Sequence, residues 1–154
     1  HWSEGYRIMR KFLVIFASAM LLNSCAPTNL YYWGEMSSKV SKYEQLAYNH
    51  YNKQTPESIC ELIVLYEDMI NNPGGIRNVV PPGIYAEYGF LLLQAQTIES
   101  FEKHATRRQR NIFKTDNYAT LFHEKGIEML EKEMELYPES KAFISPILNR
   151  VTSE

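Results

Sequence analysis

The sequence is poor in several features that mark particular protein classes. Two cysteines in 154 residues are too few for a disulfide-dense scaffold. The longest apolar run, Phe12 to Leu22, has 11 residues, which is too short for a helix to cross a bilayer about 30 Å thick. The formal net charge is only -2, so the chain has no excess of positive charge for binding nucleic acid. With 45% hydrophobic and 22% charged residues, it has the composition of one folded domain.

Reactive side chains form no recognised catalytic pattern. His123 and Glu124 begin like a zinc-protease motif, but residue 127 is isoleucine where the motif needs a second histidine. His50 and His104 stand singly, and the chain has neither a glycine-rich phosphate loop nor a nucleophile elbow. We therefore expect no enzyme activity, no cofactor and no metal site. Four glutamates at helical spacing predict a solvated helix face: Glu124, Glu128, Glu131 and Glu135.

The amino-terminal part has the pattern of a secretory signal. The basic segment Met9–Lys11 precedes the apolar run from Phe12 to Leu22. Leu22-Asn23-Ser24-Cys25 then resembles a bacterial lipobox, whose cysteine is acylated and becomes the new amino terminus. The pattern predicts that residues 1–24 are upstream residues and a lipoprotein signal peptide, and that palmitate is attached at Cys25. A type I signal peptide with a chance cysteine and a buried apolar helix are the alternatives.

Two further residues bear on location. Ala26 follows Cys25, and no acidic run follows it. By analogy with Gram-negative lipoproteins, this favours lipid anchoring in the outer membrane, facing the periplasm. Cys60 is then alone in an oxidising compartment, where an exposed thiol is a liability. Because Cys60 stands in an apolar helical pattern, we expect it to be buried and inert.

The remainder of the chain has the periodicity of helices and no sustained strand alternation. Residues 25–37 have neither period and predict a lipidated tether, which leaves 38–154 as an all-α repeat domain. Cap signals such as Thr55-Pro56 divide this domain. The predicted helices run from Ser37 or Ser38 to about Lys53, from Thr55 to Asn71, from Ile84 with a continuation through Glu99 to Phe113, from the Thr115-Asp116-Asn117 cap to Leu136, and from Ser140 to Arg150 with an interruption or a kink near Pro146.

Two segments repeat one spacing of bulky and small residues. The spacing resembles the first helix of a tetratricopeptide repeat, in which the small residue stands where the second helix crosses closely. Gly126 has the place of the matching small residue in the second helix of the second unit, whereas Glu133 stands where alanine is usual. The repeated positions are Tyr43, Leu46, Ala47 and His50 in the first unit and Tyr85, Tyr88, Gly89 and Leu92 in the second.

The second unit is longer than the repeat requires. Gly126 follows Tyr85 by 41 residues, where a repeat of about 34 residues expects about 16. The excess of about 25 residues predicts an elongated second hairpin with a protruding tip near 114–117, with a disordered loop as the alternative. The last helix is predicted to cap the stack.

Three segments together resemble a known family. They are Leu30–Gly34, Pro82–Leu92 and Glu133–Ser140. The chain is similar over its mature length to a family of uncharacterised bacterial lipoproteins, domain of unknown function 4810. The resemblance implies no enzymatic activity. Because such proteins are often encoded beside lipoproteins similar to the curli secretion channel, it implies an accessory role with an envelope channel-type lipoprotein as partner.

Two sets of residues are candidates for binding a partner. The first is a basic cluster in the inserted stretch, formed by Lys103, Arg107, Arg108, Arg110 and Lys114, for which ordinary solubility is the alternative. The second is Tyr31, Tyr32 and Trp33, whose aromatic rings suit either a membrane interface or a groove into which the segment folds back.

The sequence thus predicts an outer-membrane-anchored module that binds protein partners of the cell envelope. The alternative is a lipoprotein that binds a small ligand or cell-wall fragment in a groove lined by tyrosines. The tyrosines considered for this groove are Tyr43, Tyr48, Tyr51, Tyr66, Tyr85 and Tyr88.

Overall fold

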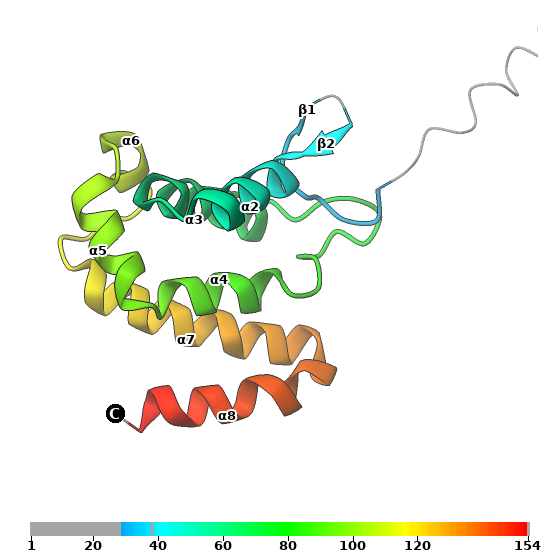
Figure 1. The fold of residues 1–154 in the computed structure, drawn as a ribbon. Coiled ribbons are helices and arrows are strands. Elements are labelled where there is room, and N and C mark those ends of the chain that lie inside the picture. Colours follow the sequence, from blue (N-terminus) through cyan, green and yellow to red (C-terminus); the bar gives the residue numbers. More distant parts are fainter. Residues whose placement is uncertain (1–28, 38, 154) are drawn as a thin grey trace, which may run out of the picture.

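The computed structural model describes residues 29–37 and 39–153, and Figure 1 shows its fold as a stack of helices. The predicted signal peptide and the lipid-attachment residue Cys25 lie outside the described residues. The described chain consists of β1 (Met36–Ser37), β2 (Val40–Ser41), α2 (Lys42–Lys53), α3 (Pro56–Asn71), α4 (Ile84–Leu92), α5 (Ala95–His104), α6 (Arg107–Arg110), α7 (Tyr118–Leu136), η1 (Pro138–Ser140) and α8 (Lys141–Thr152). The prediction of an all-α fold is confirmed.

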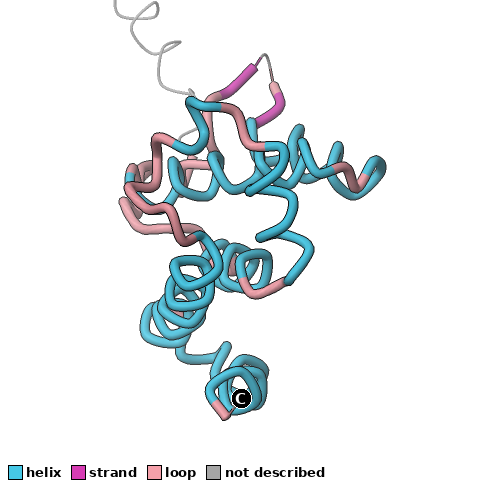
Figure 2. The backbone as a smooth tube through the Cα atoms, turned by 90° about the vertical axis from the view of Figure 1, so that its left-hand side faces the viewer, coloured by secondary structure: helices cyan, strands magenta, loops and turns pink. Residues whose placement is uncertain are grey.

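The helices form successive antiparallel neighbours. α2 packs on α3, α4 packs on α7, and α8 packs on α7. Figure 2 shows α8 at one edge of the stack and the two short strands at the opposite edge.

The first helix begins later than predicted. Ser41, and not Ser37 or Ser38, is its N-cap: the Ser41 hydroxyl accepts a hydrogen bond from Glu44 N at 3.2 Å, and Ser41 N donates to Glu44 Oε2 at 3.0 Å. The residues before it pair instead as the antiparallel strands β1 and β2, with Met36 opposite Ser41. This small hairpin includes Ser37, one of the two serines predicted to start the helix, in β1.

The second predicted helix is confirmed at both ends. Thr55 caps α3 by accepting a hydrogen bond from Ser58 N at 3.2 Å, with Pro56 in the first turn. The helix ends at Asn71, before Pro73. Its apolar face, which includes Ile59, Ile63 and Met69, supplies much of the larger core cluster.

Two glycines allow α4 and α7 to cross closely, as predicted. A Cβ on Gly89 would lie 2.8 Å from the carbonyl oxygen of Gly126, and a Cβ on Gly126 would lie 2.7 Å from Leu93 Cγ. Neither helix therefore has room for a side chain at the crossing point. This pair makes the most extensive helix contact in the described chain.

The prediction of an elongated second hairpin is wrong, because the inserted residues fold back and pack against α3 instead of protruding. α4 ends at Leu92, and α5 packs mainly against α3. Phe101 on α5 is completely buried, with its ring centroid 5.5 Å from Phe113, 5.1 Å from Tyr118 and 5.2 Å from Phe122. Burial of these four aromatic rings stabilises the turned-back arrangement over a protruding tip.

The last helix covers the outer side of α7. Ile144 and Leu148 of α8 are buried and cluster with Leu130. Of the predicted interruption or kink near Pro146, the interruption is wrong, because α8 is continuous from Lys141 to Thr152 with Pro146 inside it. Pro146 and Ala142, whose carbonyl would have accepted the missing N–H bond, are both exposed, so water can replace that bond.

Replacing Gly89 by alanine should lower the free energy of unfolding by roughly 1–2 kcal/mol, because the new Cβ overpacks the crossing. Urea unfolding followed by circular dichroism measures the change. Thr120→Ala, on the exposed side of α7, is the control and should change stability by less than about 0.5 kcal/mol. A Gly89→Ala protein more stable than the wild type, as helix propensity alone would make it, contradicts the close crossing.

Candidate functional site

The segment before β1 folds back onto the helices. Ile76 N donates to the carbonyl oxygen of Asn29 at 3.1 Å, and Arg77 N donates to that of Leu30 at 3.0 Å. Gly75 permits this approach, because it has a φ of +74° and a Cβ there would lie 2.6 Å from Leu30 C. Residues 29–37 therefore belong to the folded domain, which begins before residue 38.

The three predicted aromatic residues lie on this segment and are half-buried. The Tyr32 hydroxyl donates to Asp68 Oδ2 at 2.8 Å, and burial together with this carboxylate raises the pKa of Tyr32 to about 12. Trp33 packs on the core with its ring centroid 5.2 Å from that of Tyr43. Tyr31 accepts a hydrogen bond from Arg77 Nη1 at 3.0 Å. Tyr32 and Trp33 thus fasten the segment to α3 and α2, and Tyr31 fastens it to the loop between α3 and α4.

A first groove of about 490 Å³ lies beside this segment. Tyr31, Tyr32, Trp33 and Tyr43 supply its aromatic lining. Charged side chains of both signs also line it, namely Lys39, Glu35 and Glu44. The shape and lining suit a small ligand with a flat or apolar part.

The other tyrosines do not line one common groove. Tyr66 and Tyr88 are buried in the core, with ring centroids 5.3 Å apart, whereas Tyr48 and Tyr51 are exposed on α2. The Tyr66 and Tyr43 hydroxyls both donate to Glu87 Oε2, at 2.9 Å each. The hydrogen bonds tie α2, α3 and α4 together, and this is a structural use of the repeated tyrosines.

Buried Glu67 lies at the centre of a second polar network. Its Oε1 accepts from the Tyr88 hydroxyl at 2.5 Å and pairs with Lys125 Nζ at 2.8 Å, while Asn71 Nδ2 donates to its Oε2 at 3.1 Å. These contacts satisfy the carboxylate and join α3, α4 and α7. A helical hydrophobic pattern does not predict such a residue, since Glu67 follows Tyr66 on the buried side of α3.

A buried carboxylate also caps α4. Glu133 on α7 accepts hydrogen bonds from Gly83 N at 2.7 Å and from Ala86 N at 3.3 Å. It thereby satisfies backbone N–H groups at the start of α4, where no side chain of that helix's own cap does so. Burial raises the pKa of Glu133, and the backbone hydrogen bonds oppose that rise. Glu133 therefore has a structural role in capping α4.

The predicted basic cluster is divided among three places. Arg110 is used structurally: its Nε donates to the Ala105 carbonyl at 3.1 Å, and its Nη2 donates to the Glu102 carbonyl at the end of α5. Lys103 pairs with Glu99 on the exposed face of α5. The other members, Arg107, Arg108 and Lys114, are exposed.

A second groove, here called the α6 groove, has a volume of about 580 Å³ and lies between α6 and the pair α2–α3. Leu46, Val64, Leu65 and Ile112 provide its apolar lining. Arg108 lines it, whereas Arg107 lines none of the grooves described and Lys114 borders a separate polar hollow. Its other charged lining residues are Lys42, Glu35, Glu61 and Asp68.

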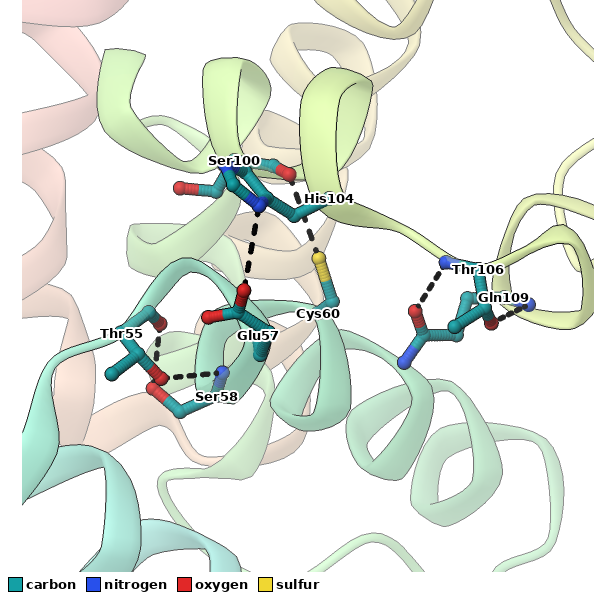
Figure 3. A network of polar contacts seen from close by, with 8 residues as sticks. All are labelled: Thr55, Glu57, Ser58, Cys60, Ser100, His104, Thr106 and Gln109. Atoms are coloured by element: carbon teal, nitrogen blue, oxygen red, sulfur yellow. Dashed lines mark hydrogen bonds and ion pairs between the residues drawn. The ribbon is translucent and has the colours of Figure 1, made fainter.

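Figure 3 shows polar contacts between α3 and α5 and the cap of α6, whose Thr106 and Gln109 line the α6 groove. His104 Nδ1 lies 3.4 Å from Glu57 Oε1, and the Cys60 thiol donates to the Ser100 carbonyl at 3.6 Å. Thr106 caps α6, accepting from Gln109 N at 3.2 Å. No sequence signal predicted this groove, because the return of α5 and α6 depends on long-range aromatic packing.

Cys60 has the character predicted for an inert residue. It is 1% exposed. Burial, which disfavours the thiolate, raises its pKa to about 11. Its packing against α5 is structural.

Within residues 29–37 and 39–153, no group of three or more histidine, cysteine, aspartate or glutamate side chains is placed to hold a metal ion. Among the same residues, every helix is too short or too polar to span a bilayer. No family model, curated protein or solved structure matches the chain.

The buried tyrosines should make the protein less stable at alkaline pH. Burial and the nearby carboxylates of Glu87 and Glu67 raise the pKa values of Tyr66 and Tyr88. Below about pH 10 both residues are protonated whether folded or unfolded, so their contribution is fully present. Above that pH the unfolded chain loses protons that the folded chain keeps, and the free energy of unfolding falls by about 1.4 kcal/mol per pH unit for each.

Urea unfolding at about pH 9, 10 and 11 measures this fall. Tyr88→Phe should make it shallower, because one of the two groups is gone. Equal losses in the wild type and in Tyr88→Phe would contradict the assignment of Tyr88 to this effect.

Proposed function

We propose that the protein is a lipoprotein of the outer membrane, anchored through acyl chains on Cys25, whose periplasm-facing helical domain binds a protein partner of the cell envelope. The α6 groove is the observation that carries this proposal. Its apolar lining comes from three elements, namely α2, α3 and the loop after α6. A groove of this kind suits an amphipathic segment of another protein.

The charges around the α6 groove favour a partner segment over an uncharged ligand. Lys42 and Arg108 carry positive charge, whereas Glu35, Glu61 and Asp68 carry negative charge. A partner segment with an apolar stripe and flanking charges of both signs would satisfy the apolar lining and pair with the exposed side chains. The resemblance to domain of unknown function 4810 suggests a channel-type lipoprotein as the partner.

The second candidate is the binding of a small ligand or cell-wall fragment in the first groove. Its aromatic lining by Tyr31, Trp33 and Tyr43 favours this possibility. Native mass spectrometry of the purified protein distinguishes the two functions. A monomer that retains a small molecule supports the second candidate, whereas a stoichiometric complex with another protein supports the first.

Radiolabelled palmitate should be incorporated into the wild-type protein and not into a Cys25→Ser variant. The reason is that the lipobox cysteine is the predicted acyl acceptor. Labelling of growing cells, followed by immunoprecipitation and autoradiography, measures the incorporation. A wild-type protein without label, recovered in normal amount, would refute the anchor.

Reversing the charge of Arg108 should show whether the partner binds in the α6 groove or responds only to the overall positive charge of α6. Arg108→Glu should reduce recovery of the partner roughly tenfold, equivalent to about 1.4 kcal/mol. Arg107→Glu is the matched control, because both arginines are exposed on α6 but only Arg108 lines the groove. Partner recovery from cross-linked, detergent-solubilised envelopes is quantified by mass spectrometry. Equal losses in both variants would refute the groove as the docking site.

A further inference from the structure

We propose that one end of the domain rests on the surface of a phospholipid bilayer. This end, here called the membrane-facing end, consists of Leu30, Tyr31, Ile76 and Arg77. The proposal rests on the lipid anchor proposed above and adds the orientation of the domain. Its support comes from apolar exposure, from charge and from the length of chain that leads to Cys25.

The first observation is a pair of exposed aliphatic side chains on adjoining segments. Leu30 is 51% exposed and Ile76 is 63% exposed. The two backbone hydrogen bonds between residues 29–30 and 76–77 hold these segments side by side. One exposed aliphatic residue is ordinary, but two large ones on paired segments form an apolar point suited to the boundary of headgroups and acyl chains.

The second observation is a cation next to that point. Arg77 is exposed, its Nη1 donates to the Tyr31 hydroxyl at 3.0 Å, and its guanidinium lies 5.6 Å from the centre of the Tyr31 ring. Tyrosine side chains favour the membrane–water interface, and arginine is attracted to lipid phosphates. The hydrogen bond to Tyr31 leaves other guanidinium N–H groups available to a phosphate.

The third observation is the short chain between the anchor and the domain. Asn29 follows Cys25 by four residues, a span of at most roughly 14 Å even when fully extended. Figure 1 shows that the described chain begins at the end where the loop between α3 and α4 lies, with α5 and α6 at the opposite end. An acylated Cys25 would hold Leu30 and Ile76 close to the bilayer and leave α6 directed away from it.

Fluorescent probes on the full-length, lipidated protein test this orientation. Ile76→Cys and Tyr51→Cys are each labelled with a thiol-reactive nitrobenzoxadiazole dye and reconstituted into vesicles of phosphatidylethanolamine and phosphatidylglycerol. Tyr51, in the last turn of α2, is the control because it is 79% exposed. Buried Cys60 should not react, and wild-type protein taken through the same labelling measures any background.

The probe at residue 76 should emit at shorter wavelength in vesicles than in detergent-free buffer, and nitroxide groups on the lipid acyl chains should quench it. The probe at residue 51 should show neither change. Equal quenching at both positions, or a probe at residue 76 that stays in water, overturns the orientation. If palmitate labels the protein but the residue 76 probe stays in water, only this inference fails; if palmitate labelling fails, the proposed anchor fails as well.

Discussion

The close crossing of α4 and α7 is the contact on which the rest of the fold depends. Gly89 and Gly126 bring the two backbones together without intervening side chains, and Glu133 joins the start of α4 to the second half of α7. These two contacts fix both the separation of the helices and their relative position along the axis. With α7 fixed in this way, α8 can pack on one side, and the aromatic cluster around Phe101 can close the other.

Local signals in the sequence predicted the boundaries of several helices, because these depend on residues close in the chain. Thr55 caps α3 through its side-chain oxygen, as predicted, and Asn117, within the predicted Thr115-Asp116-Asn117 cap signal, caps α7 in the same way. The close helix contact at Gly126 was also predicted, because the repeated spacing places a small residue where two helices cross. The start of α2 was missed because Ser37 and Ser41 are both suitable caps, and only strand pairing chooses between them.

The candidate site was less predictable, because it is formed by segments distant in sequence. The basic residues 107, 108 and 110 are almost adjacent in the chain. Yet Arg110 donates hydrogen bonds to carbonyl groups at the end of α5, whereas Arg108 borders a groove. This division depends on the turn at Leu93–Gln94, whose direction is set by burial of Phe101 and Phe113. The spacing of repeats gave the number of extra residues but carried no information about which helix they would cover.

The attachment of residues 29–33 also has a mechanical consequence. A pull at Asn29 would load the backbone pair with residues 76 and 77 and the Tyr32–Asp68 hydrogen bond before it reached the first turn of α2. Several bonds would share that load, together with the packing of Trp33 against Tyr43. The helices are thereby protected from tension at the amino-terminal end. A force on the chain would first break the contacts of residues 29–33 and only then unfold a helix.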